Sequence, residues 1–578
     1  MNHQLFLNCP RSNYVRTNYV LLNGRWDFIF DKENKGEELS YSRGFEKEWN
    51  IIVPFPYETK LSGINIPELV ENVWYQRHLD IKKEKNRRYI LHLEGVDHLS
   101  KVFVNGNYVG QDFGAYHRHS FDVTDNVLDG DNLLVIKCED SFSKEQLRGK
   151  QRNKGENYEC WYLDFVGIYK SVWLEVVNEK HIQKIKITPD LDAKSISFDI
   201  LLSSYEKLAL DISIFEKDVL IGHTSVVPSS SQEEIVVKSD KDVIPWSVEN
   251  PYLYDLVFLL KDDKGNILDE VFSYAGFRKL EVKDGLIYMN HQKLFQKLVL
   301  DQGYWKDSLA TPPCVDALKD DIVKMKAFGF NGCRKHEKVE DERFLYLCDI
   351  LGYLLWEEIP SFYEYSEKSK ELYLHELKHI LEDNYNHPSI ITWTLFNESW
   401  GIYGIRDSQE QQAFVDDMYH FTKRFDPYRF VITNDGWDHT LSDILTIHHY
   451  HQNGEELYSF YDSRDHALQD DYKGHYMHVI ANGYKDQGQP IIFSEFGGTA
   501  FIKNTHDGNW GYGIGVKDDE EYLERLNGLF SALQRMEYSS GYCYTQVSDV
   551  EQEVNGLLNH EHKPKIAPKL LKEIQDKR

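Results

Sequence analysis

The second half of the chain constrains the fold most, because from residue 277 apolar strand-like runs alternate with amphipathic helical stretches. The helical stretches include Val315–Phe328, Glu340–Leu351, Glu367–Tyr385 and Glu520–Met536. Eight apolar runs fall within about 300 residues, a pattern typical of a (β/α)8 barrel. The join between the fifth and sixth runs is short for a helix. The runs are 297–302, 330–336, 353–360, 389–401, 429–435, 444–451, 490–497 and 541–546.

The first half reads as two all-β domains. Residues 1–177 contain many short alternating strands and a hairpin signal at Asn105-Gly106, which predict a β jelly-roll sandwich. Residues 178–276 carry about seven further strands in about a hundred residues, which is typical of an immunoglobulin-like β-sandwich. The predicted fold is therefore a multidomain α and β chain that ends in a barrel over residues 277–578.

The composition of the chain disfavours several kinds of partner and location. The net charge of −28, from 66 basic and 94 acidic residues, disfavours nucleic acid and anionic membranes as partners. The sequence has no apolar run of membrane-spanning length, and its N-terminus lacks the apolar core of a signal peptide, so we expect a cytoplasmic protein. Seven cysteines without a CxxC pair argue against a disulfide framework.

The fourth run, Ser389–Gly401, ends in a way that points to chemistry. Its apolar residues give way abruptly to Asn397, Glu398 and Ser399. A carboxylate there needs a partner or an opening, and barrel active sites lie at the carboxyl ends of the strands. The alternative is a strand end whose glutamate meets solvent or a salt bridge.

Most other runs also end in polar or aromatic residues, which together predict a polar pocket at the barrel mouth. These strand ends are Asp301 and Gln302, Arg334 and His336, Asn434 and Asp435, His449 and Tyr450, Glu495, and Tyr544 and Gln546.

Glu398 and Glu495 lie 97 residues apart, which is three βα units of about 32 residues each. They should therefore face one another across the barrel mouth. Two such carboxylates suit glycoside hydrolysis: a separation near 5–5.5 Å implies retention of configuration, and a wider gap implies inversion. The alternative is that either glutamate forms a buried ion pair with Arg334 or a lysine.

Over nearly its whole length the chain resembles glycoside hydrolase family 2, which contains β-galactosidases, β-glucuronidases and β-mannosidases. The segments LNGRWDF, IIVPFPYE, VWYQR, VFVNGNYVG and VGIYKSVWLE resemble its sugar-binding domain, and AGFRKLEV resembles the end of its immunoglobulin-like domain. LFNESWG and IIFSEFGG resemble its acid/base and nucleophile signatures. The resemblance implies that Glu398 is the acid/base, Glu495 the nucleophile and Asn397 the ligand of the sugar 2-hydroxyl, with retention of configuration.

The chain departs from the family at several points. Arg334 to Lys338 read RKHEK where Arg-x-Ser-His-x-Pro is frequent in the family. The turn is therefore altered, and His336 is expected to keep the sugar contact. Strand eight offers Tyr544 where a tryptophan is usual. An Asn-x-Lys in the barrel binds the substrate carboxylate of the family's glucuronidases. Here that pattern stands at Asn178–Lys180, outside the barrel, which disfavours a glucuronidase.

Further residues are assigned to the substrate or to packing. His448, His449 and His451 cannot all converge on a metal, because alternate residues of a strand point opposite ways. We expect His449 and Tyr450 to bind sugar hydroxyls and the other two histidines to pack. Asp301 is expected to contact the terminal sugar, and Trp437 to stack on it or to pack in its loop. Some large family members use magnesium, but nothing here secures its ligands, so no cofactor or metal is expected.

These observations predict a retaining exo-β-glycosidase acting on terminal β-linked sugars, with a neutral sugar such as a β-galactoside as substrate. β-Glucuronidase or another specificity of the family is the alternative. From a different class, a non-catalytic carbohydrate-binding protein is the other hypothesis, although a pure binder has no need of both carboxylates. The expected partner is a glycoside, with no nucleic acid and no membrane, and association into a homo-oligomer is left open.

Overall fold

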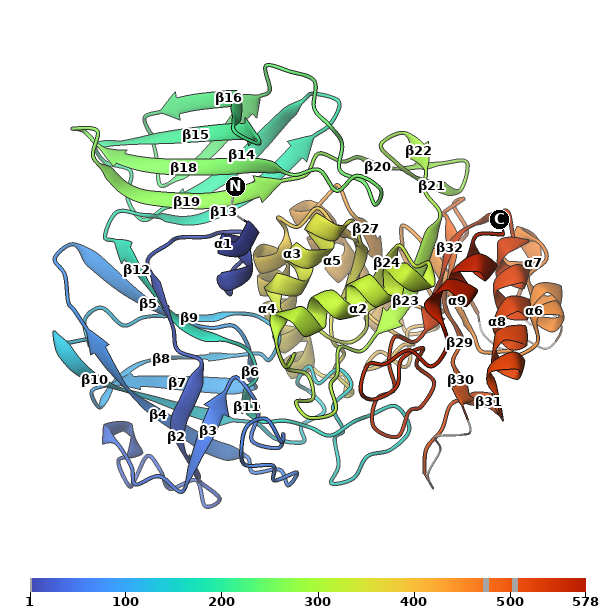
Figure 1. The fold of residues 1–578 in the computed structure, drawn as a ribbon, viewed down its shortest axis with the longest axis horizontal. Coiled ribbons are helices and arrows are strands. Elements are labelled where there is room, and N and C mark those ends of the chain that lie inside the picture. The colour runs from blue at the N-terminus through green and yellow to red at the C-terminus, as the bar shows by residue number, and fades with distance from the viewer. Residues whose placement is uncertain (1–2, 471–472, 474–477, 502–507, 578) are drawn as a thin grey trace.

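The computed structural model describes residues 3–470, 473, 478–501 and 508–577. Two β-sandwiches lie on one side of a barrel wrapped by helices (Figure 1). This arrangement confirms the predicted fold class. The proposed domain division after residues 177 and 276 falls within one residue of the ends of β12 (Val172–Asn178) and β19 (Ile267–Ala275).

The N-terminal sandwich pairs a four-stranded sheet with a six-stranded one. The predicted hairpin joins β7 to β8, and Asn105 and Gly106 have φ of 53° and 78°, as a tight hairpin turn requires. The four-stranded sheet is β1 (Tyr19–Leu21), β12, β5 (Arg87–Leu93) and β9 (His119–Asp122). The six-stranded sheet is β3 (Trp49–Val53), β2 (Gly24–Phe30), β4 (Asn72–Ile81), β10 (Gly130–Glu139), β7 (Leu99–Val104) and β8 (Asn107–Phe113).

The second sandwich has seven strands, as expected for an immunoglobulin-like domain. Alternation sets its core: Leu208, Leu210, Ile212 and Ile214 of β15 are buried and the residues between them are not. One sheet is β13 (Ile182–Asp190), β14 (Ser195–Leu202) and β17 (Gln232–Lys238); the other is β16 (Val219–Val226), β15 (Leu208–Glu216), β18 (Tyr254–Asp262) and β19.

The first residues of the chain tie the other two domains together. Helix α1 (His3–Asn8) places Phe6 against Tyr274 of β19 and Tyr346 of α3 (Glu342–Leu351), with ring centroids 5.6 and 5.4 Å apart. Val15 then pairs with Phe272. This segment thus packs on the second sandwich and the barrel rather than inside the N-terminal sandwich.

The barrel is a sheet of eight parallel strands, and every predicted run supplies one of them. Residues 433–444, between the fifth and sixth strands, contain no helix, in agreement with the short join. In sheet order the strands are β27 (Phe430–Ile432), β26 (Ile390–Thr394), β25 (Leu354–Glu358), β24 (Gly332–Lys335), β23 (Gln296–Asp301), β32 (Ser539–Thr545), β29 (Ile491–Gly497) and β28 (Leu445–His449).

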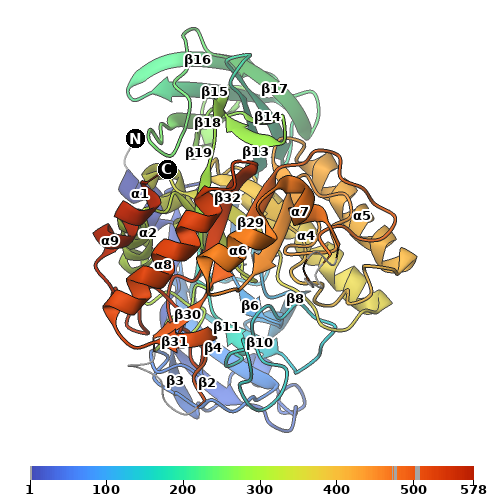
Figure 2. The ribbon, with the colours of Figure 1, turned by 90° about the vertical axis from the view of Figure 1, so that its right-hand side faces the viewer.

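Helices cover the outside of the barrel, and Figure 2 shows several of them from the side. They include α2 (Val315–Phe328), α3 (Glu342–Leu351), α4 (Glu367–Asn384), α5 (Gln409–Phe425), α6 (Gly454–Phe460), α7 (Arg464–Leu468), α8 (Asp519–Gln534) and α9 (Pro568–Gln575).

The two ends of the barrel differ in chemistry. Leu298, Leu300, Trp356 and Cys543 form an apolar core that continues into Ile287 of the preceding small sheet. That sheet, β20 (Leu280–Lys283), β21 (Leu286–Met289) and β22 (Gln292–Lys293), comes before the first barrel strand. Apolar packing thus accounts for the barrel interior, and the polar residues gather at the carboxyl ends of the strands.

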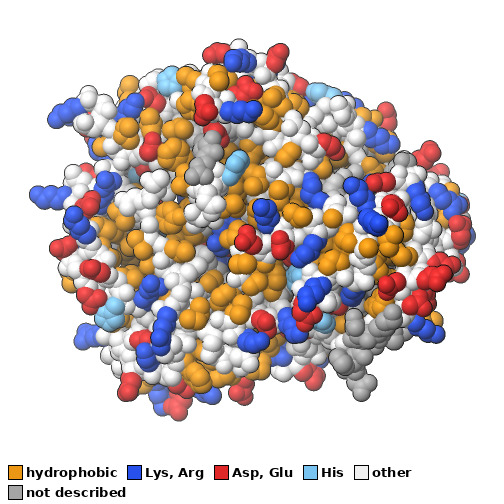
Figure 3. Space-filling view, in the orientation of Figure 1, with side chains coloured by type: hydrophobic (Ala, Val, Ile, Leu, Met, Phe, Trp, Pro, Cys, Tyr) orange, Lys and Arg blue, Asp and Glu red, His pale blue; other side chains and the backbone are white. Residues whose placement is uncertain are grey.

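In the described part of the chain, no helix combines the length and the apolar character needed to cross a membrane. Lysine and arginine side chains are interspersed with aspartate and glutamate over the face shown in Figure 3.

Candidate active site

Glu398 and Glu495 meet at the carboxyl end of the barrel. Glu398 follows β26, and Glu495 lies within β29. A carboxylate oxygen of each and a ring nitrogen of His448 lie within 4.8 Å of one another. The Glu398 side chain is 22% exposed and that of Glu495 is 6% exposed, so Glu398 is the more open of the two.

An unusual turn sets the position of Glu398. Glu398 and Ser399 both have left-handed φ, 49° and 60°, which non-glycine residues adopt rarely and mostly at functional sites. The Glu398 N–H donates to the backbone oxygen of Asp435 at 3.0 Å, and the Ser399 N–H donates to Oδ1 of Asn434 at 2.9 Å. The neighbouring strand end therefore holds the acidic residue in place.

Arg334 is the hub of the site and is completely buried. Its Nε lies 2.6 Å from Glu358, and its Nη1 lies 2.5 Å from Asp435 and 2.9 Å from Glu495. Its Nη2 donates to Oδ1 of Asn397 at 2.5 Å. Burial lowers the pKa of Arg334, but the three carboxylates outweigh burial and raise it well above its usual value.

His448 bridges the acidic groups. Its Nδ1 lies 2.8 Å from Oε1 of Glu398, and its Nε2 lies 2.9 Å from Oδ2 of Asp435. Burial lowers the pKa of His448, yet Glu495 and Asp435 more than reverse this effect and raise the pKa to about 10. With a carboxylate at each nitrogen, the ring is an imidazolium.

Glu495 is held ionised. Burial raises its pKa, but His448, Arg334 and His336 oppose this and bring the pKa below its usual value. Arg334 donates to Oε1, and the hydroxyl of Tyr450 donates to Oε2. Both oxygens therefore already face donors.

Asn397 offers an unused donor. The residue is fully buried, and its Oδ1 accepts from Arg334. Its Nδ2 is buried with no hydrogen-bond partner. Since buried polar atoms are rarely left unpaired, this amide is a candidate ligand for a substrate oxygen.

His336 and Tyr450 also lie at the site. Nδ1 of His336 is 3.0 Å from Oε1 of Glu358, and its ring centroid is 5.9 Å from that of Trp400. Tyr450 contacts Oγ1 of Thr545 at 3.0 Å and stacks on Tyr512.

Trp437 packs edge-on against His448, with ring centroids 5.6 Å apart. The predicted residues His336, Tyr450 and Trp437 therefore lie around the carboxylate pair, as do Arg334 and Asn397.

Two predicted sugar ligands point away from the carboxylate pair. His449 turns away, with Nδ1 2.7 Å from the hydroxyl of Tyr461, because its neighbour His448 takes the inward face of the strand. Tyr544 lies on the outer face of β32, where its ring stacks on Phe530 of α8.

Asp301 also has partners within the protein. Its Oδ2 lies 2.8 Å from Nζ of Lys335, and its Oδ1 accepts the Gly303 N–H at 2.8 Å. Both of its oxygens thus have protein partners, and a contact between Asp301 and the terminal sugar stays a prediction.

Two residues that the sequence did not single out also lie at the site: His448, which was expected to pack, and Lys150 of the N-terminal domain. Lys150 is buried, and its Nζ lies 4.9 Å from the ring centroid of Trp400. Among the described residues no carboxylate lies within 4.0 Å of that Nζ. No local pattern marks Lys150, because it comes from a loop more than 240 residues before Glu398.

The three groups Glu398, His448 and Glu495 are close enough to hold a metal ion. Magnesium prefers oxygen ligands in octahedral geometry. Here both nitrogens of His448 already face carboxylate oxygens, so the set does not suit Mg²⁺. That no cofactor is required stays a prediction.

Known proteins resemble the chain along its length. It is 28% identical to a β-galactosidase of Thermoanaerobacter pseudethanolicus over 380 residues, which are 62% of this chain and 47% of that protein. The chain spans about half the length of the curated relatives it matches.

Solved structures share the fold. A β-glucuronidase from Ruminococcus gnavus in complex with D-glucuronic acid superposes with a TM-score of 0.79 at 19% identity, over 98% of each chain. A family 2 β-galacturonidase from Eisenbergiella tayi gives 0.74 at 20% identity, over 97% of each chain.

Three family models match in succession. The sugar-binding domain of glycosyl hydrolases family 2 matches residues 20–177, the family 2 domain matches 180–278, and the family 2 TIM barrel domain matches 280–577. The last alone covers just over half of the 578 residues. The chain belongs to glycosyl hydrolases family 2.

Proposed function

We propose that this chain is a retaining exo-β-glycosidase with Glu398 as acid/base and Glu495 as nucleophile. The observation that carries the proposal is the close approach of the two carboxylates, with oxygens within 4.8 Å. Retaining enzymes hold their carboxyl groups about 5–5.5 Å apart, whereas inverting enzymes leave room for a water molecule at about 6.5–9.5 Å.

The environments of the two glutamates support different roles. Glu495 is buried among Arg334, His448 and Tyr450, which favour its anion, as a nucleophile requires. Glu398 is more exposed and can exchange a proton with water between the two half-reactions.

The reaction then takes two steps. The Glu495 carboxylate attacks the anomeric carbon while Glu398 gives its proton to the departing oxygen, forming a glycosyl-enzyme and releasing the aglycone. Glu398 next removes a proton from water, which attacks the same carbon and displaces Glu495. The unpaired Nδ2 of Asn397 donates a hydrogen bond to the sugar 2-hydroxyl. This hydrogen bond strengthens in the transition state, as positive charge develops on the sugar ring.

For the sugar, we infer a neutral β-glycoside such as a β-galactoside. The net charge of −28 disfavours an anionic substrate, and Asn-x-Lys stands at residues 178–180, outside the barrel. Several curated relatives are named β-galactosidase.

A β-uronide is the second candidate, and Lys150 favours it. This buried ammonium lies beside Trp400 without a carboxylate within 4.0 Å among the described residues. A buried cation of this kind could pair with a substrate carboxylate.

A panel of p-nitrophenyl β-glycosides, including galactoside, glucoside, mannoside, glucuronide and galacturonide, tests the proposal. We expect turnover of at least one member, with the β-anomer of the sugar released first, as observed by proton NMR. Release of the α-anomer would contradict the retaining mechanism. Tight binding of sugars with no turnover of any member would favour the carbohydrate-binding alternative.

A further inference from the structure

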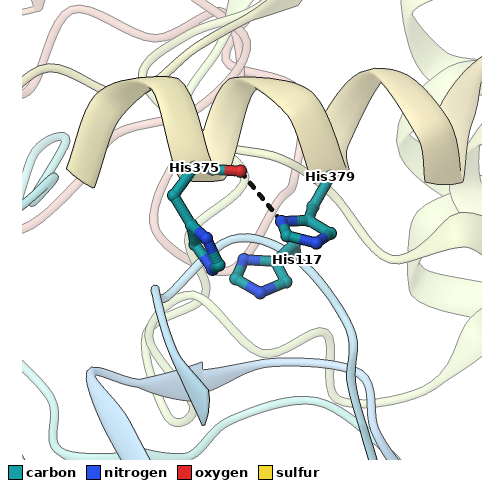
Figure 4. A group of neighbouring side chains, drawn as sticks. All are labelled: His117, His375 and His379. Atoms are coloured by element: carbon teal, nitrogen blue, oxygen red, sulfur yellow. Dashed lines mark hydrogen bonds between the residues drawn. The ribbon is translucent and has the colours of Figure 1, made fainter. Parts of the chain in front are cut away.

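A cluster of histidines lies where the N-terminal sandwich meets the barrel, apart from the carboxylate pair. His375 and His379 are one turn apart on α4, and His117 approaches them from the loop between β8 and β9 (Figure 4). One ring nitrogen of each lies within 4.8 Å of the others. Histidines at i and i+4 on a helix present their rings on one face, which is a common way to build a metal site.

Hydrogen bonds to groups other than the three rings occupy one nitrogen on two of the rings. Nδ1 of His379 lies 2.9 Å from the backbone oxygen of His375, and Nδ1 of His117 lies 3.1 Å from Oε2 of Glu376. Metal-ligating histidines usually make such a bond to a carbonyl or carboxylate, which fixes the tautomer and leaves Nε2 as the ligand atom.

Two of the remaining ring nitrogens lack partners. Nε2 of His117 and Nε2 of His375 are both buried with no hydrogen-bond partner. Two orphaned ring nitrogens at one point are rare in native proteins and call for a ligand. A metal ion takes the lone pair of each neutral ring.

Asp112 of β8 completes the set. Its Oδ2 lies 3.7 Å from Nε2 of His117, and its Oδ1 lies 3.6 Å from Nε2 of His375. Both distances exceed a hydrogen bond. They are close to the separation of about 3.4 Å between neighbouring ligands of a tetrahedral metal with bonds of about 2.0–2.1 Å.

His119 is close by but does not belong to the set. Its Nδ1 contacts Oγ of Ser100 at 2.8 Å, and its Nε2 contacts the backbone oxygen of Gly114 at 2.8 Å. Both nitrogens are thus used. The candidate ligands are therefore the three imidazoles of His117, His375 and His379 and the carboxylate of Asp112, which faces two of them.

We propose that His117, His375, His379 and Asp112 form a binding site for a divalent transition metal of the zinc type. Three imidazoles and a carboxylate suit Zn²⁺ in tetrahedral geometry, whereas Mg²⁺ and Ca²⁺ prefer oxygen ligands. The Asp112 and His375 side chains are 28% and 27% exposed, which gives an ion access from solvent.

The charge around His117 also suits a cation. Carboxylate oxygens of Asp112 and Glu376 lie 3.7 and 3.1 Å from the two nitrogens of the His117 ring. A metal ion at Nε2 would supply the positive charge that these carboxylates favour, and Glu376 would support His117 from behind.

The site would fasten two domains together. Asp112 and His117 come from the N-terminal sandwich, and His375 and His379 come from a barrel helix. The backbone already approaches closely here: a Cβ on Gly114, whose φ is 119°, would lie 2.7 Å from Cε1 of His117 and 2.8 Å from Cδ of Glu376. A metal at this seam stabilises the folded chain because the unfolded chain has no preformed site.

Zinc binding by the full chain tests the proposal. Protein treated with a chelator and then dialysed against Zn²⁺ should hold about one zinc per chain by elemental analysis, and its melting temperature should rise. The double variant H375A/H379A should lose that zinc and the rise in melting temperature. H420A, an exposed histidine on the neighbouring helix α5, is the matched control and should keep both.

Two further measurements separate this site from unspecific binding. E376Q keeps all four ligands and should weaken zinc binding by about 10–100-fold, as loss of a supporting carboxylate does elsewhere. Co²⁺ bound to the wild type should show the intense visible absorption of tetrahedral cobalt, and D112N should change it. Retention of one tightly bound zinc by H375A/H379A, or no zinc in the wild type, would overturn the proposal.

Discussion

Nδ1 of His448 lies 2.8 Å from Oε1 of Glu398, and the same nitrogen lies 3.5 Å from Oε2 of Glu495. One imidazolium therefore stands between the two carboxylates that we propose to carry out the chemistry. Its second nitrogen faces Asp435, which also contacts Arg334. Arg334 and the imidazolium of His448 thus both contact Glu495 and Asp435, and their positive charge keeps Glu495 ionised.

The raised pKa of His448 predicts a pH dependence of stability. Burial opposes it, but Glu495 and Asp435 bring the pKa to about 10, above the usual value of about 6.5. Because the folded state binds the proton more tightly, the stabilisation is fully present below about pH 6.5 and is lost as the pH rises through about 10. The free energy of unfolding from denaturant titrations should therefore fall more steeply between pH 7 and 10 in the wild type than in H448N. Parallel curves would contradict the assignment.

Replacement of Glu495 by alanine should reduce kcat by more than about 10⁴-fold, because the glycosyl-enzyme cannot form. Azide fits the space left by the carboxylate and attacks from the same side, so added azide should restore turnover and yield an α-glycosyl azide. The matched variant E398A should lose about 10²–10⁴-fold and yield a β-glycosyl azide, because azide then attacks the glycosyl-enzyme. The same azide anomer from both variants would contradict the division of roles.

The sequence predicted the barrel and the meeting of Glu398 and Glu495 at one rim for a physical reason. Apolar runs such as 389–396 must be buried whatever surrounds them, and parallel strands place their carboxyl ends at one rim. The spacing of Glu398 and Glu495 then follows from the repeat. The buried strands depend only on the local sequence, and the spacing of the two glutamates depends only on the length of the repeated βα unit.

The direction of single side chains could not be predicted in the same way. His448 and His449 differ only by one position of strand register, and that position decides which one faces Glu495. Asp301 is taken by Lys335, a partner that becomes visible only when β23 and β24 pair. Lys150 comes from another domain, and its place beside Trp400 depends on how the domains pack.

Asn397 predicts a dependence on the sugar 2-hydroxyl. Its unpaired Nδ2 should donate to that hydroxyl, and loss of such a bond costs several kcal/mol in the transition state. N397A should therefore lower kcat/KM about 10²–10³-fold on the aryl glycoside that the wild type cleaves best. On the matching 2-deoxy glycoside the two enzymes should differ by less than about tenfold. An equal loss on both substrates would show that Asn397 acts only by holding Arg334, whose Nη2 donates a hydrogen bond to Oδ1 of Asn397.

Lys150 decides between the two candidate sugars. If its ammonium binds a substrate carboxylate, K150Q should lower kcat/KM on the preferred uronide by about 10–100-fold, mainly through KM, because a charge-assisted bond of about 1.5–3 kcal/mol is lost. Neutral glycosides should be affected less than about threefold. K154Q is the matched control, since Lys154 lies in the same loop but pairs with Glu156 at 46% exposure of its side chain. If K150Q instead weakens the galactoside and the uronide alike, Lys150 supports Trp400 and the wall of the site, and the neutral sugar remains the proposed substrate.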